Sequence, residues 1–209
     1  MIELKCKQGS PEWFEARRAI PTSSCFSQIL TAAGTLSSSW PNYMNKLLAE
    51  YIDPKVSVKE RVYTKAMARG NEMEPAAREA YEFITGNSVR EVGGLWLDDT
   101  MQSLCSPDGL IDGQPKGLEI KCPNLSTHIG YCRTGKLPTI YTMQVQAGMA
   151  FTDYESWDFM SYHPAYTEMI ITVGRDEKLI RTIKKTLAFF IKELNKEKAI
   201  IDQTLNQGF

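Results

Sequence analysis

The chain has 209 residues, of which 43% are hydrophobic and 23% charged, and its net charge is −1 at pH 7. This length suits one well-buried domain over residues 1–209 and is short for two domains. The near-neutral charge argues against an open groove that grips nucleic acid by bulk charge, but not against a closed ring or local basic clusters. No stretch is apolar enough to span a membrane, and five scattered cysteines without a CxxC motif indicate a cytoplasmic protein with reduced thiols.

The first part of the chain has helical patterns. Four helices are predicted, over residues 11–21, 22–33, 40–51 and 65–85. Ser10 followed by Pro11 is typical of an N-cap with proline at the first helical position, and Thr22 begins a second capping sequence. We expect the charged segment 56–61 to be exposed, and Pro75 to kink or restart the fourth helix.

The middle of the chain changes to the alternating period of strands. Strands are predicted over 93–97, 103–111, 116–121, 157–162 and 168–173, and helices over 126–133, 139–151 and 176–202. The turn sequence 112–115 joins the second and third strands, so a meander is the simplest arrangement of the first three. The last helix carries an apolar stripe that predicts core or subunit packing: Leu179, Ile183, Leu187, Phe190 and Leu194. The sum is an α+β fold with a small central mixed sheet flanked by helices.

Two carboxylates and an amine lie on neighbouring predicted strands. Asp108 precedes Gly109, where a chain can bend sharply. Glu119 and Lys121 are two residues apart, so their side chains face the same side of one strand. Mg²⁺ prefers oxygen ligands, which Asp108, Glu119 and the Ile120 carbonyl can supply. Lys121 can orient a water molecule and stabilise negative charge, so the pattern predicts metal-dependent phosphodiester cleavage; the alternative is a surface ion pair.

Two further residues support this prediction from the flanking helices. Glu74 lies on the helix that precedes the strands, where it can act as an additional acid on the metal side. Gln144 lies on a following helix and can hold a water molecule or a phosphate oxygen. Tyr141 can lie beside it, although core packing with a satisfied hydroxyl group is the commoner role of a tyrosine.

Seven motifs occur in order along the chain: Trp13-x-x-x-Arg17 with Thr22-x-Ser24, Leu47-Leu48-Ala49-Glu50, Arg69-Gly70-x-x-x-Glu74, Cys105-Ser106-Pro107-Asp108-Gly109-Leu110, Gly117-Leu118-Glu119-Ile120-Lys121-Cys122-Pro123, Gln144-Val145-Gln146 and Arg175-Asp176-Glu177-Lys178. In these motifs the chain resembles the phage lambda exonuclease family of YqaJ-type viral recombinases, within the PD-(D/E)xK nuclease superfamily. The resemblance covers most of the chain, and the two central motifs together are highly specific.

The resemblance implies a restriction-endonuclease-like core and an Mg²⁺-dependent, processive 5′→3′ exonuclease on double-stranded DNA, with Mn²⁺ as a substitute ion. Such enzymes release 5′-mononucleotides and leave 3′ single-stranded tails for recombination by strand annealing. It also implies a ring-shaped homotrimer, a single-strand annealing protein as partner, DNA with 5′-phosphorylated ends as substrate, and a phage or prophage origin in a bacterial host.

The resemblance further implies that Arg17, Ser24 and Ser106 form a pocket for the 5′-phosphate. Arginine offers a planar fork to phosphate, and a helix start favours anions. For Ser24 the alternative is plain N-capping, and Arg18 is a rival for the role of Arg17.

Two more DNA contacts are expected, the first of them from the same resemblance. Met67 takes the place of an apolar residue that splits the terminal base pairs, although a buried helix methionine is commoner. Arg133 can touch the DNA backbone, and a solvated basic loop explains it equally well.

Two other functions are open at this stage. One is an endonuclease of the restriction or repair type, against which the predicted 5′-phosphate residues argue. The other is a non-catalytic DNA-binding recombination scaffold, against which the intact Asp108, Glu119 and Lys121 argue.

Overall fold

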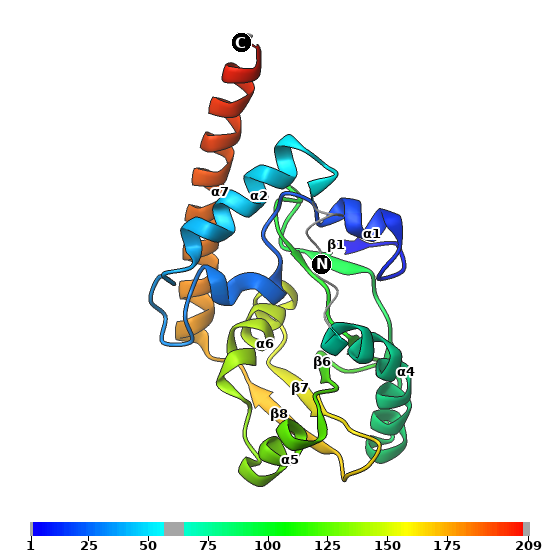
Figure 1. The fold of residues 1–209 in the computed structure, drawn as a ribbon. Coiled ribbons are helices and arrows are strands. Elements are labelled where there is room, and N and C mark those ends of the chain that lie inside the picture. The colour runs from blue at the N-terminus through cyan, green and yellow to red at the C-terminus, as the bar shows by residue number, and fades with distance from the viewer. Residues whose placement is uncertain (1, 57–64, 207–209) are drawn as a thin grey trace.

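The computed structural model describes residues 2–56 and 65–206, without the side chains of residues 65–67 and 71. Most of the predicted exposed segment 56–61 lies outside this range. No helix in the described part is long and apolar enough to cross a membrane. The architecture is α+β, with helices arranged around two sheets (Figure 1).

The larger sheet is mixed and has five strands. Its order is β2 (Val89–Arg90), β5 (Gly109–Ile111), β6 (Lys116–Lys121), β7 (Ser156–Ser161) and β8 (Met169–Gly174). The strands β6 and β7 run parallel over six residue pairs, and the other neighbours are antiparallel. This central mixed sheet confirms the predicted fold class.

The smaller sheet shows that the predicted meander was wrong. It joins β1 (Ile2–Leu4), β3 (Gly94–Trp96) and β4 (Leu104–Cys105) in antiparallel pairs. The predicted strand 103–111 is therefore two strands, one in each sheet. The break falls at Ser106 and Pro107, because proline has no N–H for a ladder. Asp108 follows this break, at the point where the chain passes from one sheet to the other.

The helices lie mostly where they were predicted. They are α1 (Pro11–Ala16), the 3₁₀ helix η1 (Ser23–Gln28), α2 (Trp40–Ile52), α4 (Lys65–Thr85), α5 (Leu125–Thr134), α6 (Thr139–Thr152) and α7 (Glu177–Asn206). The first helix ends earlier than predicted, and the chain then adopts a left-handed conformation at Ala19, with φ 56°. The predicted helix 22–33 is only the short η1. Pro75 lies inside a continuous α4.

Two hydrophobic clusters cover the two faces of the larger sheet. On one face Trp157 and Phe159 of β7 pack into the main core with α6 and α7. On the other face Leu118 and Ile120 of β6 pack with Tyr81 of α4. All five predicted stripe residues of α7 are buried, which confirms core packing for that helix. The helix α4 is thus fixed against β6, the strand with the predicted catalytic residues.

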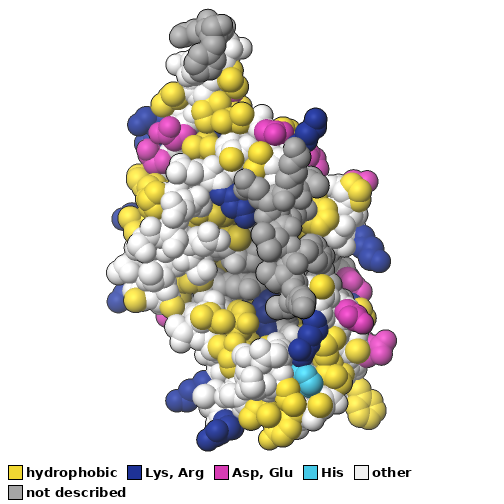
Figure 2. All heavy atoms as spheres, in the orientation of Figure 1, with side chains coloured by type: hydrophobic (Ala, Val, Ile, Leu, Met, Phe, Trp, Pro, Cys, Tyr) yellow, Lys and Arg dark blue, Asp and Glu magenta, His cyan; other side chains and the backbone are white. Residues whose placement is uncertain are grey.

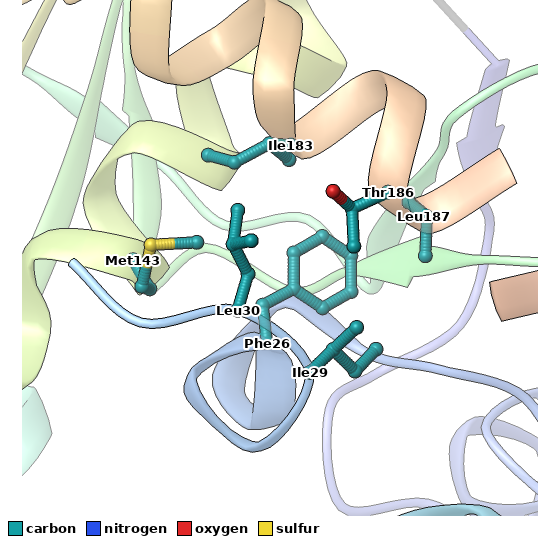
Figure 3. Close-up of a pocket in the computed structure, with 7 residues that line it drawn as sticks. All are labelled: Phe26, Ile29, Leu30, Met143, Ile183, Thr186 and Leu187. Atoms are coloured by element: carbon teal, nitrogen blue, oxygen red, sulfur yellow. The ribbon is translucent and has the colours of Figure 1, made fainter. Parts of the chain in front are cut away.

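A small apolar pocket lies between η1, α6 and α7 (Figure 3). Its cavity volume is about 10 Å³, and its walls are Phe26, Ile29, Leu30, Met143, Ile183, Thr186 and Leu187. This volume is at the lower limit for one water molecule. The pocket is therefore an imperfection of packing in the main core and not a ligand site.

A buried polar network anchors α4 to the larger sheet. Asp158 of β7 is 3% exposed and accepts hydrogen bonds from the hydroxyl groups of Tyr81 (2.7 Å) and Thr172 (2.6 Å). The Nζ atom of Lys116 lies 3.3 Å from the same carboxylate. The network joins α4, β6, β7 and β8, so it maintains the position of α4 on the sheet.

Disrupting this network is expected to destabilise the fold. Asp158→Ala leaves the ammonium group of Lys116 without its buried partner and should lower the free energy of unfolding by about 3–5 kcal/mol. Tyr81→Phe removes one hydrogen bond to a charged group and should cost about 2 kcal/mol. Urea unfolding checks both values, with Tyr166→Phe, an exposed tyrosine, as the control. Equal stability of Asp158→Ala and wild type would contradict the anchoring role.

Candidate active site

The structure brings Asp108, Glu119 and Lys121 together at the junction of the two sheets. The backbone N–H of Asp108 donates to the carbonyl of Leu118 (3.2 Å). The Asp108 Oδ2 atom accepts a hydrogen bond from the backbone N–H of Ile120 (2.6 Å). These two bonds hold Asp108 across from β6, where the ammonium group of Lys121 pairs with the carboxylate of Glu119.

Burial disfavours the ionised forms of the carboxyl groups in this cluster. Glu119 is 2% exposed, and the Lys121 side chain 26%. Burial, and then repulsion by Asp108, raises the pKa of Glu119 to about 8. Burial also raises the pKa of Asp108. For Lys121 burial acts to lower the pKa, but attraction by Glu119 and Asp108 outweighs it and raises the pKa overall. One ammonium group therefore faces one buried and one half-buried carboxyl group.

Glu74 joins the same electrostatic cluster from α4. Burial and repulsion by Asp108 raise its pKa to about 7. One turn later on α4, the Arg78 Nη2 atom lies 2.7 Å from the Glu74 carboxylate, and its Nη1 atom lies 2.7 Å from Glu91. Arg78 is nearly buried, with 12% of its side chain exposed. It thereby orients Glu74 on the helix.

Tyr141 of α6 contacts the cluster through Lys121. The Lys121 Nζ atom lies 5.4 Å from the centre of the Tyr141 ring, within the range of a cation–π contact. The same ring packs against Phe159 of β7, with centroids 5.2 Å apart. Tyr141 therefore packs against the core and also lies beside Lys121, whereas its predicted position beside Gln144 stays a prediction.

The donor chemistry of the cluster fits a hard divalent cation. Asp108, Glu119 and the Ile120 carbonyl offer oxygen atoms, which Mg²⁺ prefers together with water and phosphate oxygens. Among the described residues, no three His, Cys, Asp or Glu side chains form a complete metal cage. Two carboxylates and a carbonyl instead suit an ion that keeps most of its ligands as water and substrate. The raised pKa values of Asp108 and Glu119 show that their ionised forms are disfavoured without a further positive charge, which a bound cation would supply.

These shifts predict that the metal-free protein loses stability as the pH rises from about 5 to 8. An unfolded glutamate has a pKa of 4.5, whereas those of Glu74 and Glu119 rise to about 7 and about 8 on folding. Between these values the folded state holds protons that the unfolded state has released, so a higher pH favours unfolding. Urea midpoints measured in EDTA across this range check it. A midpoint that rises with pH would contradict the prediction.

A second cluster lies on the N-terminal side of Asp108. The Arg17 Nη1 atom donates to Ser106 Oγ (3.0 Å), and its Nη2 atom lies 3.4 Å from Ser24 Oγ. The Arg17 guanidinium group stacks over the Trp13 ring, 4.2 Å from its centroid. The Trp13 Nε1–H is shared between the Gly93 carbonyl (2.8 Å) and Ser106 Oγ (3.2 Å). Arg17, Ser24 and Ser106 thus meet, although they come from separate segments.

Arg18, the sequence rival of Arg17, points elsewhere. Its guanidinium group pairs with Glu15 at 2.6 Å and reaches the backbone carbonyl of Glu50. Of these two arginines, Arg17 therefore is the one that meets Ser24 and Ser106.

Three predicted site residues have no described contact with these clusters. Gln144 is half-buried on α6, and Arg133 is exposed in the last turn of α5. Met67 lies in the first turn of α4, but its side chain is outside the described part of the chain. Their predicted roles stay predictions.

Three supporting residues were not predicted as part of the site. Arg78 could have been found from its spacing, since it follows Glu74 by four residues on a helix. Trp13 was part of a motif, but its contact with Ser106 spans 93 residues. Gln8 donates from Nε2 to the carbonyl groups of Val92 (2.8 Å) and Pro107 (2.7 Å), and so ties the N-terminal segment to the junction. No local sequence signal indicates such long-range contacts.

Known proteins with the same fold include exonucleases. An alkaline exonuclease (LHK-Exo) from Laribacter hongkongensis is 32% identical, with a TM-score of 0.83 over 95% of this chain and 99% of that one. Its complex with dAMP matches equally well. A phage related exonuclease from Haemophilus somnus 129PT, 13% identical with a TM-score of 0.67 over 90% and 99% of the two chains, shares the fold.

Sequence comparisons give the family. Among curated proteins none matches this chain. The model of the YqaJ-like viral recombinase domain matches residues 12–155, a range that holds both clusters. The chain therefore belongs to the YqaJ-like viral recombinase family, as the motifs predicted.

Proposed function

We propose that this protein is a divalent-metal-dependent 5′→3′ exonuclease that degrades double-stranded DNA from 5′-phosphorylated ends. The observation that carries the proposal is the closeness of the two clusters. Ser106 belongs to the arginine cluster and Asp108 to the carboxylate cluster, and only Pro107 separates them. Two peptide units span at most about 7 Å, so a 5′-phosphate at Ser106 would lie about one nucleotide from the carboxylates. This spacing supports release of mononucleotides.

The residues of the carboxylate cluster have separate roles in metal binding and in phosphodiester cleavage. Asp108, Glu119 and the Ile120 carbonyl would hold Mg²⁺, for which Mn²⁺ would substitute, and Glu74 would add an acid on the metal side. A bound ion supplies activation of water and neutralises charge on the phosphate. Lys121, kept protonated by its neighbours, donates hydrogen bonds to the attacked phosphate and orients the attacking water.

The other predicted contacts act on the DNA. Arg17, Ser24 and Ser106 hold the terminal phosphate, because a guanidinium fork and two hydroxyl groups converge there. Gln144 would hold a water molecule or a phosphate oxygen, and Tyr141 supports Lys121. Met67 would separate the terminal base pair, and Arg133 would contact the backbone.

Assembly and biological context complete the proposal. We infer a processive homotrimeric ring that leaves 3′ single-stranded tails and works with a single-strand annealing protein in phage or prophage recombination, in the cytoplasm of the bacterial host. A ring is compatible with the net charge of −1, because a closed ring that encircles DNA stays on it with less electrostatic attraction. On the face drawn in Figure 2, Lys and Arg side chains are scattered among acidic and hydrophobic ones.

A cleavage assay on linear duplex tests the proposal. DNA labelled on one strand, with 5′-phosphate or 5′-hydroxyl ends, is incubated with Mg²⁺ or EDTA. We expect Mg²⁺-dependent release of mononucleotides that prefers the phosphorylated end. Internal cuts without end preference would favour an endonuclease. No cleavage by folded protein would favour a scaffold, and equal cleavage by wild type and Lys121→Ala would contradict the proposed mechanism.

A further inference from the structure

The solvent face of α7 carries a basic stripe far along the chain from both clusters. We define the stripe by six exposed positions: Lys178, Arg181, Lys185, Phe189, Lys192 and Lys196. Their spacing of three, four, four, three and four residues places them on one side of a helix. With a rise of 1.5 Å per residue, the stripe is about 27 Å long. Five of its six positions are cationic in a chain whose net charge is −1.

Acidic side chains do not neutralise this stripe. Between its two ends α7 has one acidic residue, Glu193, and it lies outside the series. Glu193 is 4.0 Å from Lys196, at the limit of an ion pair. Within the described part of the chain, no ion pair involves Lys178, Arg181, Lys185 or Lys192. By contrast Lys184, beside the stripe, pairs with Asp153 at 2.9 Å.

The one apolar member of the stripe is an exposed aromatic ring. Phe189 is 48% exposed and lies between Lys185 and Lys192. Its ring stacks on Trp40 of α2, with centroids 5.9 Å apart and planes 22° apart. Trp40 in turn contacts the buried Phe190, so the aromatic pair is fixed to the core. Figure 1 shows α2 lying beside α7. The stripe therefore has a rigid aromatic platform at its centre.

We propose that this stripe binds single-stranded DNA. A row of cations complements a phosphate backbone, and an aromatic platform among them can stack an unpaired base. Duplex bases are already stacked on one another, so the exposed ring favours a single strand over a duplex. The inference rests on the proposed function in one respect: an exonuclease that digests one strand produces the other as single-stranded DNA.

Fluorescence anisotropy with labelled oligo(dT) of about 20 nucleotides tests the stripe. EDTA prevents cleavage, and the salt concentration is varied from about 50 to 200 mM. The triple variant Arg181→Gln, Lys185→Gln, Lys192→Gln should reduce the slope of log affinity against log salt by about 2, since each phosphate contact on a single strand contributes about 0.7. The matched control Lys5→Gln, Lys7→Gln, Lys55→Gln removes three other exposed cations and should retain the wild-type slope.

Phe189→Leu gives a second, independent signature. It keeps an apolar contact with Trp40 but removes the stacking face, so affinity should fall about tenfold with an unchanged salt slope. Thermal unfolding verifies that each variant is folded. Equal slopes for the stripe and control variants would overturn the proposal. Duplex that competes as well as oligo(dT), with no effect of Phe189→Leu, would overturn the single-strand assignment.

The outcome is separable from that of the proposed function. Loss of slope in the stripe variant, in a protein that cleaves no DNA with Mg²⁺, would support the stripe and reject the exonuclease. Normal cleavage with an unchanged slope would reject the stripe alone.

Discussion

Asp108→Asn is expected to abolish Mg²⁺-dependent cleavage, by about a thousandfold or more, and to make the metal-free protein more stable. The raised pKa of Asp108 means that the folded state disfavours its ionised form. Asparagine removes that charge while its Oδ1 atom can still accept the Ile120 N–H. In EDTA the Tm should therefore rise. For a chain of this length the rise is about 2–4 °C for each kcal/mol that the substitution adds to the free energy of unfolding.

The same variant should lose stabilisation by metal. Mg²⁺ that binds only the folded protein raises the Tm of the wild type by mass action, and this rise should vanish in Asp108→Asn. Asp112→Asn is the matched control, because Asp112 is an exposed carboxylate four residues later in the chain. Thermal unfolding with Mg²⁺ or EDTA, together with the cleavage assay, checks both parts. A lower Tm of Asp108→Asn in EDTA would show that the carboxylate stabilises the metal-free fold, contrary to our interpretation.

The central site was predictable because its signals are local. Glu119 and Lys121 share one face of a strand by the simple alternation of side chains, and α7 shows its buried stripe by helical spacing. Asp108 was placed before a sharp bend, and the structure puts it at the change from β4 to β5. The raised pKa values of Asp108 and Glu119 show that these carboxylates destabilise the metal-free fold, and such a trade-off is typical of functional residues.

Elements that depend on distant partners were not predictable. The strand β3 pairs with β1, about 90 residues earlier, and β1 has only three residues. No pattern within so short a strand indicates its partner, so the three-stranded meander was the simpler hypothesis. The length of the predicted helix 22–33 was overestimated, because a capping sequence predicts where a helix begins but not how far it extends. The hydrogen bonds of Trp13 and Arg17 to Ser106 likewise depend on how α1 meets the junction, because they span 93 and 89 residues.

Arg17→Gln is expected to remove the preference for 5′-phosphorylated ends. Cleavage from these ends should fall about a hundredfold, the effect of losing a charged donor to a phosphate, whereas cleavage from 5′-hydroxyl ends should change little. Glutamine keeps a polar side chain of similar reach but loses the charge and the fork. Ser106→Ala should have a smaller effect in the same direction, because Arg17 remains over the Trp13 ring.

Arg18→Gln separates this prediction from a general loss of positive charge. Arg18 is the adjacent residue, but it pairs with Glu15 and does not join Ser106. It should therefore retain the wild-type ratio of rates on phosphorylated and hydroxyl ends. If Arg17→Gln slows both kinds of end equally, Arg17 supports the fold or the duplex and does not read the phosphate. If Arg18→Gln loses the preference as fully as Arg17→Gln, the pocket is defined by diffuse charge, and the convergence of Arg17, Ser24 and Ser106 is not its cause.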